Sequence, residues 1–258
     1  MLKTDSLDPD SISAGLRTKH IGRKVLVYNS TSSTNDVTAE YAKNPSNDGL
    51  AVFAEEQTAG RGRTGSRWIA AAGDSILCSV LLTECGLSAD LLSLTCAVAI
   101  AETIGQPARI KWPNDILIGG RKVAGILLEA KPVPHGTAHI IGIGINCHQA
   151  ETSFPPELQK IATSIDIENG SRCDRISLSR RLLASIDNWL DIASYDGDKV
   201  ICRWKQLSIQ LGHRVTLTYN GRRFTGHCIG LDPQNGLILR LDTGGVRIFS
   251  ATHASIVR

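Results

Sequence analysis

Residues 60–68, with the sequence GRGRTGSRW, limit the fold more strongly than any other stretch of this chain. Three glycines and three arginines in nine positions disfavour both a stable helix and a well-paired strand. Each arginine carries a permanent charge on a planar group that suits carboxylates and phosphates. The composition therefore predicts a loop that closes around an anion, and the alternative is a solvated basic turn.

The same loop has the spacing G-x-G-x-x-G, which is typical of dinucleotide-binding proteins. That fingerprint must open a helix within a βαβ unit. Here the loop is followed by the apolar run SILCSVLL at 75–82, which indicates a buried strand. Glu84 lies near the sequence distance of a ribose contact, but no helix separates it from the loop. The dinucleotide interpretation is therefore disfavoured.

Composition indicates an ordinary globular protein. The 258 residues allow one large domain, or a large and a small one, and 42% of them are hydrophobic. No apolar run approaches the ~20 residues that cross a bilayer, and residues 1–23 lack the apolar core of a signal peptide. The seven cysteines include no C-x-x-C pair, which favours reduced, mostly buried thiols. We therefore expect a cytoplasmic protein without a membrane partner.

The net charge of +3 is unevenly distributed. From residue 200 onward the chain has eight lysines and arginines against two aspartates, an excess of about +6. Such a patch suits nucleic acid, a nucleotide or an acidic protein. Nucleic acid is the weaker choice, because the segment has no helix-turn-helix or RNP-like signature.

The N-terminal part predicts an extension followed by strands and a helix. Residues 1–24 are polar and are expected to form a disordered or irregular extension. Strands are expected at 25–28 and 51–57, and the second leads into the Gly/Arg loop. A helix is expected over 88–104, with Ser88 as its N-terminal cap and a glycine at its end.

A hydroxyl-rich segment at 29–36 precedes a helical pattern over 37–42. Ser33 or a neighbour is expected to cap this helix, with Asp36 three positions on. A helix N-terminus surrounded by hydroxyl groups also accepts an anion or a polar head group. Both interpretations remain open at this point.

Two apolar runs joined by Gly119 and Gly120 predict a hairpin with a two-residue turn. The resulting register pairs Asp115 with Ala124 and places Asp115 on the same face as Lys122. The two charged side chains then become diagonal neighbours at about 7–8 Å, within reach of one small ligand. The alternative is an ordinary ion pair at a strand edge.

A strand at 138–146 is expected to have two different faces. Three isoleucines point to one side, which we assign to the core, and Gly142, Gly144 and Asn146 share the other. Glycine in a strand marks a bulge, a close packing contact or a ligand that lies on the backbone. Ligand and packing explanations are equally open.

The C-terminal part predicts helices and then a small β-structure. A helix is expected over 177–195 and a shorter one through Trp204. From Arg214 short strands alternate with turns, which suggests a small barrel. We therefore expect a large domain at 25–205 and a small one at 206–258.

Taken together, these motifs resemble those of the biotin protein ligase family. The matching segments, in the family's order, are Ser33-Thr34-Asn35, Gln57 with the loop 60–68, KWPND at 111–115, RKVAGILL at 121–128 and GIGIN at 142–146. The resemblance covers the chain from about residue 25 to its end. It points to the form without an N-terminal DNA-binding domain, because the residues before the first strand are too few for a winged helix.

The resemblance implies an α/β (α+β) fold. A mixed β-sheet flanked by helices, like the catalytic domain of class II aminoacyl-tRNA synthetases, is expected before a small C-terminal SH3-like β-barrel. It also implies that biotin and ATP form biotinyl-AMP and that a lysine of a biotin carboxyl carrier protein then takes the biotinyl group. ATP brings Mg²⁺, and no metal ligand is assigned to the protein. Neither DNA nor membrane is an expected partner, and the chain is expected to be a monomer or homodimer.

The resemblance also implies roles for individual residues. It assigns catalysis to Lys122, Arg63 and Asp115. It assigns biotin binding to Ser33, Thr34, Asn35, Gln57, Gly60, Arg61, Gly62, Arg63, Lys122, Gly142 and Gly144. It assigns contacts with ATP or the adenylate to Arg61, Arg63, Trp68, Asn114, Asp115, Lys122 and Asn146.

This chain departs from the family pattern at Thr64 and Ser66, where basic residues are usual, and at 251–254, where a Gly-Glu pair is more usual. Two alternative functions remain. One is a lipoate or octanoate ligase of the same fold, which needs a long narrow acyl tunnel. The other is a nucleic-acid-binding regulator.

Overall fold

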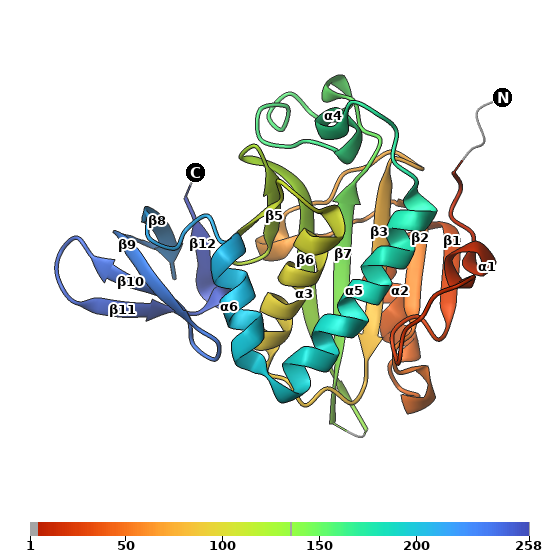
Figure 1. Cartoon of the computed structure of the whole chain (residues 1–258), viewed down its shortest axis with the longest axis horizontal. Helices are drawn as coiled ribbons and strands as arrows, with labels where there is room; N and C mark the ends of the chain where they lie inside the picture. Colours follow the sequence, from red (N-terminus) through yellow and green to blue (C-terminus); the bar gives the residue numbers. More distant parts are fainter. Residues whose placement is uncertain (1–4, 135, 258) are drawn as a thin grey trace.

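A computed structural model describes residues 5–134 and 136–257, and two β-sheets organise this part of the chain (Figure 1). The larger sheet has seven strands in the order β1-β2-β3-β7-β6-β5-β4. Only the pair β1 and β2 is parallel among these strand pairs of the described residues. The strands are β1 Val25–Thr31, β2 Ala51–Gln57, β3 Ser75–Leu82, β4 Arg109–Lys111, β5 Asp115–Ile118, β6 Arg121–Val133 and β7 Gly136–Asn146.

Helices cover one face of this sheet (Figure 1). The α-helices are α1 Pro9–Ser13, α2 Thr34–Tyr41, α3 Ala89–Ile104, α4 Ile165–Asn169, α5 Arg175–Tyr195 and α6 Gly197–Leu207. Helices α3 and α5 pack on the sheet, and the three isoleucines of β7 lie in the same apolar cluster as both helices. Ser88 caps α3 by accepting a hydrogen bond from Leu91 N, as expected, and Gly105 ends it.

The opposite face of the sheet is only partly covered. Helix α2 packs there against β2, β3 and β7, and a small apolar cluster forms around Leu50, Val52 and Ile140. Ile140 shares its face with Gly142 and Gly144, so this face of β7 carries an apolar side chain at first and then two glycines without side chains. The alternation predicted for residues 138–146 is confirmed.

The register of the β5–β6 hairpin differs from the expected one. Leu117 pairs with Lys122 as predicted, but a bulge at Val123 shifts the ladder, so Asp115 pairs with Gly125 rather than with Ala124. Ala124 lies in the core, on the opposite face from Lys122. A bulge inserts one residue into one strand without a clear sequence signal, which is why alternation alone gave the wrong partner.

Residues 5–24 are packed rather than frayed: apart from one short helix they are irregular, and they lie against the rest of the structure. Helix α1 begins after Asp8, whose side chain accepts a hydrogen bond from Ser11 N. Ile12 and Ile21 are fully buried in the main apolar cluster. Asp187 of α5 accepts hydrogen bonds from the backbone amides of residues 19–21. Residues 1–4 lie outside the described part.

The second sheet lies at one side of the first (Figure 1). Its five antiparallel strands follow the order β11-β10-β9-β8-β12. They are β8 Arg214–Tyr219, β9 Arg222–Asp232, β10 Gly236–Leu241, β11 Val246–Phe249 and β12 Ala254–Ile256. The small C-terminal β-structure expected from the turn pattern is confirmed. Ile209 N donates to Ile110 O at 3.0 Å and joins the connecting segment to β4.

Helix boundaries differ slightly from those expected. Helix α2 begins at Thr34 rather than near residue 37, and Ser33 occupies the N-cap position without a side-chain capping bond. Helix α5 begins two residues early because Asp174 accepts from Ile176 N and Ser177 N. All seven cysteines lie in the described part of the chain and are free. Within that part, none of the helices is long and apolar enough to span a bilayer.

Candidate active site

A cleft of about 350 Å³ opens over the bare face of β7. All but one of the site residues expected from the sequence line this cleft. They are Ser33, Thr34, Asn35, Gln57, Arg61, Gly62, Arg63, Trp68, Asn114, Asp115, Lys122, Gly142, Gly144 and Asn146. The exception is Gly60, which is buried and accepts a hydrogen bond from Trp68 N at 3.1 Å. The cleft therefore gathers motifs that lie more than a hundred residues apart in sequence.

Lys122 and Asp115 form an ion pair inside the cleft. Lys122 Nζ lies 2.5 Å from Asp115 Oδ1, so the two side chains meet as the sequence predicted. Their side chains are 27% and 18% exposed, so water reaches the pair from one side. The same Nζ lies 5.5 Å from the centre of the Trp68 ring, within the range of a cation–π contact. Lys122 thus places a partly desolvated positive charge on the cleft surface.

The bare face of β7 is covered by side chains from two other segments. A Cβ atom at Gly142 would lie 2.4 Å from Asn35 Oδ1, and one at Gly144 would lie 2.5 Å from Trp68 Cε2. These distances are too short for any side chain, so both glycines are required by close packing as observed. Packing accounts for the glycines in this structure, and the space beside them remains part of the cleft.

The start of α2 is held in place by a buried polar network. Gln57 Oε1 accepts hydrogen bonds from Thr34 N and Thr34 Oγ1 at 2.7 and 3.0 Å. Ser79 Oγ lies 2.7 Å from Thr34 Oγ1 and 2.6 Å from Asn35 Oδ1. Ser79 sits in the apolar strand β3, where an isolated serine gave no functional signal in the sequence. Its role is to orient residues 34 and 35 toward the cleft.

Arg61 of the Gly/Arg loop is anchored to α2. Its guanidinium makes two hydrogen bonds to the Asp36 carboxylate at 2.8 and 2.6 Å, and it lies 3.5 Å from Glu129. The hydrogen bond from Arg61 holds the pKa of Asp36 below its usual range. The expectation that Asp36 belongs to the N-terminal region of α2 is met, but its carboxylate pairs with the loop rather than with the helix backbone.

Arg63 connects the loop to the small sheet. Its guanidinium donates to the carbonyl oxygens of Ala251 and Ala254, and to Asn114 Oδ1 at 3.3 Å. Burial lowers the pKa of Arg63, and the nearby charge of Asp115 acts in the opposite direction. Arginine remains charged in this environment because the delocalised guanidinium keeps its proton in proteins. Arg61 and Arg63 therefore both have partners within the protein in this structure.

Trp68 is half-buried in the cleft, and its indole nitrogen is buried without a partner. Among the described residues, its Nε1 is one of the buried polar atoms without a hydrogen-bond partner. A buried donor without an acceptor costs free energy, so such groups in a native structure need an explanation. A ligand with an acceptor atom beside Trp68 would satisfy it.

Asn114 and Asn146 line the cleft but are bound to the protein. Asn114 Nδ2 donates to Ile126 O at 2.9 Å, and Asn146 Nδ2 donates to Thr163 O at 2.9 Å. These bonds fix the positions of the two amides and leave Asn114 Oδ1 in contact with Arg63. Both residues therefore shape the cleft through contacts that the sequence did not predict.

One side of the cleft comes from a segment that sequence reasoning missed. Phe154, Leu158, Ile161 and Ala162 line it, and Ser255 and Ile256 of β12 line it from the small sheet. The main chain of Lys122 holds the first segment: Lys122 N donates to Ile161 O at 2.8 Å, and Thr163 N donates to Lys122 O at 2.9 Å. In the sequence, Pro155 and Pro156 indicate a loop here and give no signal of a function.

Similarity to known proteins agrees with this geometry. A model of the biotin/lipoate A/B protein ligase family matches residues 27–146. The biotin–[acetyl-CoA-carboxylase] ligase of Mycobacterium tuberculosis is 32% identical over 263 residues, with 95% of each chain covered. The chain belongs to the biotin protein ligase family. It is a ligase of the kind that the motif order suggested.

Other biotin protein ligases show the same relationship. The bifunctional ligase/repressor BirA of Bacillus subtilis is 33% identical over 258 residues, which cover 96% of this chain and 79% of that one. The structure of the Aquifex aeolicus biotin protein ligase in complex with biotin and ATP has a TM-score of 0.78 and 25% identity, with 92% of this chain and 99% of that chain covered. The fold expected from the sequence is thereby confirmed.

Proposed function

We propose that the cleft joins biotin to ATP and then transfers biotin to a carrier protein. In the first step a carboxylate oxygen of biotin attacks the α-phosphorus of ATP, and pyrophosphate leaves. In the second step the amine of a carrier lysine attacks the acyl carbon, AMP leaves, and an amide forms with loss of a proton. The carrier is a biotin carboxyl carrier domain, in keeping with the names of the relatives.

The observation that carries this proposal is the position of Lys122 in the cleft. The first step brings an anionic carboxylate toward a polyanion, so its barrier falls when a fixed positive charge lies beside both. Lys122 Nζ is partly desolvated and is held by one partner, Asp115. When Lys122 Nζ leaves Asp115 and contacts the reacting carboxylate and phosphate instead, it neutralises the negative charge that the first step brings together.

The glycines of β7 support a flat ligand beside Lys122. Gly142 and Gly144 contribute no side chain of their own to the cleft, and Asn35 and Trp68 pack directly against them. Trp68 covers Gly144 in this structure, so biotin entry displaces or slides the indole. The unsatisfied Trp68 Nε1 then gains an acceptor from the ligand.

The Gly/Arg loop would act as the cover that excludes water. An acyl-adenylate hydrolyses unless the site is shielded until the amine arrives. Arg61 and Arg63 are the charged groups of the loop that line the cleft, and each now contacts an oxygen acceptor that a phosphate can replace. Asp115, freed from Lys122, would orient the incoming carrier amine.

Mg²⁺ enters this scheme with ATP as its substrate complex. Asp115 is paired with Lys122, and the group of side chains with metal-binding geometry in the described part of the chain lies outside the cleft. The phosphates themselves supply oxygen ligands for Mg²⁺. We therefore assign no residue of the chain as a dedicated ligand of this ion.

The test is a comparison of acyl substrates. Purified protein is incubated with ATP and Mg²⁺ plus either biotin or lipoate, and acyl-AMP is detected by mass. A labelled carrier domain is then added and its mass is followed. We expect biotinyl-AMP and a biotinylated lysine, with little lipoyl-AMP. Preferential formation of lipoyl- or octanoyl-AMP would contradict the proposal and favour the lipoate-ligase alternative.

A further inference from the structure

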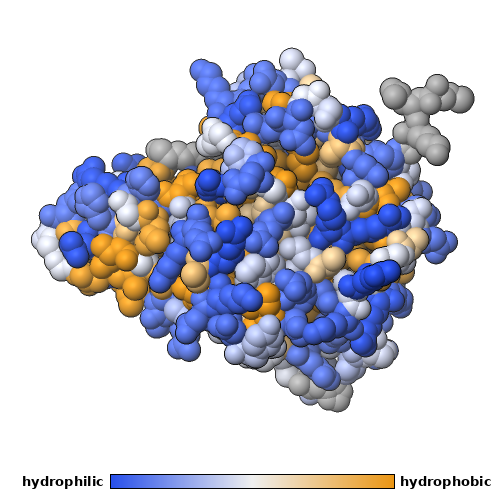
Figure 2. All heavy atoms as spheres, in the orientation of Figure 1, coloured by the Kyte–Doolittle hydropathy of each residue, from blue (hydrophilic) through white to orange (hydrophobic). Residues whose placement is uncertain are grey.

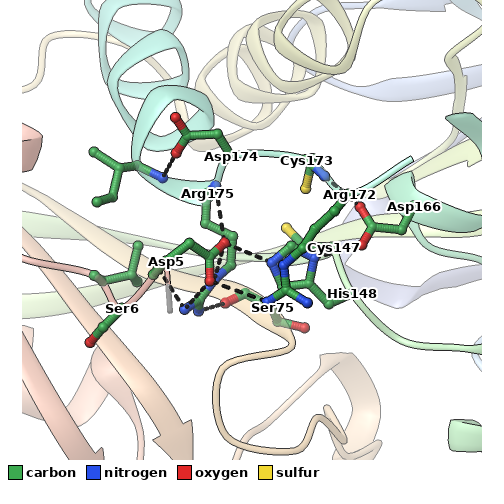
Figure 3. A network of polar contacts seen from close by, with 12 residues as sticks. Asp5, Ser6, Ser75, Cys147, His148, Asp166, Arg172, Cys173, Asp174 and Arg175 are labelled. Carbon is green, nitrogen blue, oxygen red and sulfur yellow. Dashed lines mark hydrogen bonds and ion pairs between the residues drawn. The ribbon is translucent and has the colours of Figure 1, made fainter. Parts of the chain in front are cut away.

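A second group of polar side chains lies outside the cleft, where the end of β7, helix α4 and the start of α5 meet (Figure 3). His148, Asp166 and Cys173 each offer one ligand atom there, and these atoms all lie within 4.8 Å of one another. The three residues come from different segments of the chain. The mechanism proposed above uses none of them.

His148 is held between two carboxylates (Figure 3). Its Nε2 lies 2.7 Å from Asp5 Oδ2, its Nδ1 lies 2.7 Å from Asp166 Oδ2, and its side chain is only 4% exposed. Asp5 is also bound by the buried guanidinium of Arg175. A histidine that donates one ring N–H to a carboxylate presents the other nitrogen to a cation, as is usual around metal ligands. Asp5 thus orients His148 with Nδ1 facing Asp166.

Cys173 is positioned by its own backbone. Cys173 N donates to Asp166 Oδ1 at 2.7 Å, and Asp166 Oδ2 lies 2.7 Å from His148 Nδ1. Cys173 Sγ lies within 4.8 Å of the ligand atoms of His148 and Asp166. Cys147 Sγ donates to Ile145 O at 3.5 Å and lies outside this group. The sulfur of Cys173 is therefore a third ligand atom beside the imidazole and the carboxylate.

Imidazole nitrogen, thiolate sulfur and carboxylate oxygen together form a donor set that suits zinc. A thiolate and a carboxylate also carry the two negative charges that balance a divalent cation. Ligand atoms at roughly 2.0–2.3 Å from zinc lie about 3.4–3.6 Å from one another in a tetrahedron. The observed ligand atoms all lie within 4.8 Å of one another, and the 2.7 Å contact between His148 Nδ1 and Asp166 Oδ2 opens when the ion enters between them.

We propose that His148 Nδ1, Asp166 Oδ2 and Cys173 Sγ bind a zinc ion, with water in the fourth position. The ion takes the place of the contact between His148 Nδ1 and Asp166 Oδ2. It joins the end of β7 to the start of α5, and so closes the segment 147–173, which includes the cleft-lining residues Phe154 and Ala162. The zinc site therefore stabilises one side of the cleft without touching the substrates.

The test uses Co²⁺ as the spectroscopic probe on full-length, tag-free protein that is chelator-treated and kept reduced. We expect one equivalent of Co²⁺ to produce a thiolate-to-cobalt charge-transfer band and the intense visible bands of a four-coordinate ion, and Zn²⁺ to displace it. Cys173→Ser should lose the charge-transfer band. Asp166→Asn should keep the band but bind at least roughly tenfold more weakly. Cys202→Ser, at an exposed cysteine on α6, is the matched control.

Three outcomes of the Co²⁺ experiment would contradict the zinc site. Absence of a stoichiometric charge-transfer band in the wild type, or its retention in Cys173→Ser, would overturn the proposal. Equal loss in Cys202→Ser would overturn it as well, because that thiol lies outside the group. Circular dichroism and thermal melting of the metal-free variants show whether each is folded. If Cys173→Ser is unfolded, the Co²⁺ affinity of Asp166→Asn is the deciding measurement. An affinity equal to that of the wild type would refute the site.

Discussion

Lys122 shows how one residue connects the chemistry of the cleft to its architecture. Its side chain pairs with Asp115, while its main chain hydrogen-bonds to Ile161 and Thr163. A substitution of the side chain therefore leaves the backbone contacts in place. This separation makes position 122 the clearest place to test the proposed charge neutralisation.

Lys122→Ala should reduce biotinyl-AMP formation by orders of magnitude, because the transition state loses its fixed positive charge. The thermal midpoint should change little, since the lost ion pair is partly solvated. Mass detection of biotinyl-AMP gives the rate. Lys131→Ala, an exposed lysine on the same strand, is the control and should retain the wild-type rate. A near wild-type rate in Lys122→Ala would remove Lys122 from the mechanism.

Gly144→Val tests whether the bare face of β7 receives the ligand. The new side chain would meet Trp68 at once, and displacement of that indole should cost about 1–2 kcal/mol of unfolding free energy. Biotin binding, measured by calorimetry, should be abolished. Gly86→Val is a control, since nothing lies within 4 Å of a Cβ there. Retained binding together with a large loss of stability would favour packing as the sole reason for the glycine.

At the scale of elements, the Gly/Arg loop is held by contacts at both arginines. Arg61 pairs with Asp36 on α2, and Arg63 contacts the small sheet. Within the loop, Gly62 N donates to Ser66 O at 2.7 Å, and Thr64 has a φ of 52°, in the left-handed region. We predict that the loop exchanges amide hydrogens faster without ligand than with the adenylate, whose phosphate offers further acceptors to both arginines.

Asp36→Asn should release the Arg61 anchor and increase amide exchange across residues 60–68 in the protein without ligand. Because Arg61 lowers the pKa of Asp36, the pair persists at neutral pH and is lost only as the pH falls through that lowered value, below the ordinary ~3.9. Exchange measured near pH 7 therefore reports the intact pair in the wild type. Glu40→Gln on the same helix is the control. Unchanged exchange in Asp36→Asn would mean that other contacts hold the loop.

The elements also show what the sequence could predict. Alternation correctly placed the isoleucines and glycines of β7, and Gly119-Gly120 located the β5–β6 turn. Alternation failed beyond the turn because a bulge adds a residue without a distinctive side chain. Phe154 and Ser255 could not be assigned to the cleft, because tertiary packing alone brings their segments to it.

At the scale of the whole molecule, the N-terminal segment is part of the main body, and α1 packs against β1 and α5 (Figure 1). Polar side chains cover much of the face shown in Figure 2. Ile12 and Ile21 are fully buried. The buried Arg175 binds Asp5 and Glu55, so it joins the N-terminal segment, β2 and α5. The sequence of this segment did not predict the packing, because its few apolar residues are too widely spaced to form a helix or strand pattern.

Arg175→Ala should lower the free energy of unfolding by about 3–5 kcal/mol, because it leaves two carboxylates without their buried partner. Arg172→Ala is the matched control: its side chain is 57% exposed and lies 3.5 Å from Asp5. The control should change stability by less than about 1 kcal/mol. Urea denaturation of both variants measures the difference. Similar losses in the two variants would show that Asp5 and Glu55 do not depend on Arg175.

Arg63 gives the two sheets a shared mechanical connection. One guanidinium, carried by the loop over the cleft, contacts carbonyl oxygens at the beginning of the last strand. A phosphate that draws this guanidinium inward must loosen its contact with β12. Occupancy of the cleft is then transmitted to the opposite end of the chain. A fluorophore attached near the C-terminus would consequently report, from outside the cleft, whether a nucleotide is bound within it.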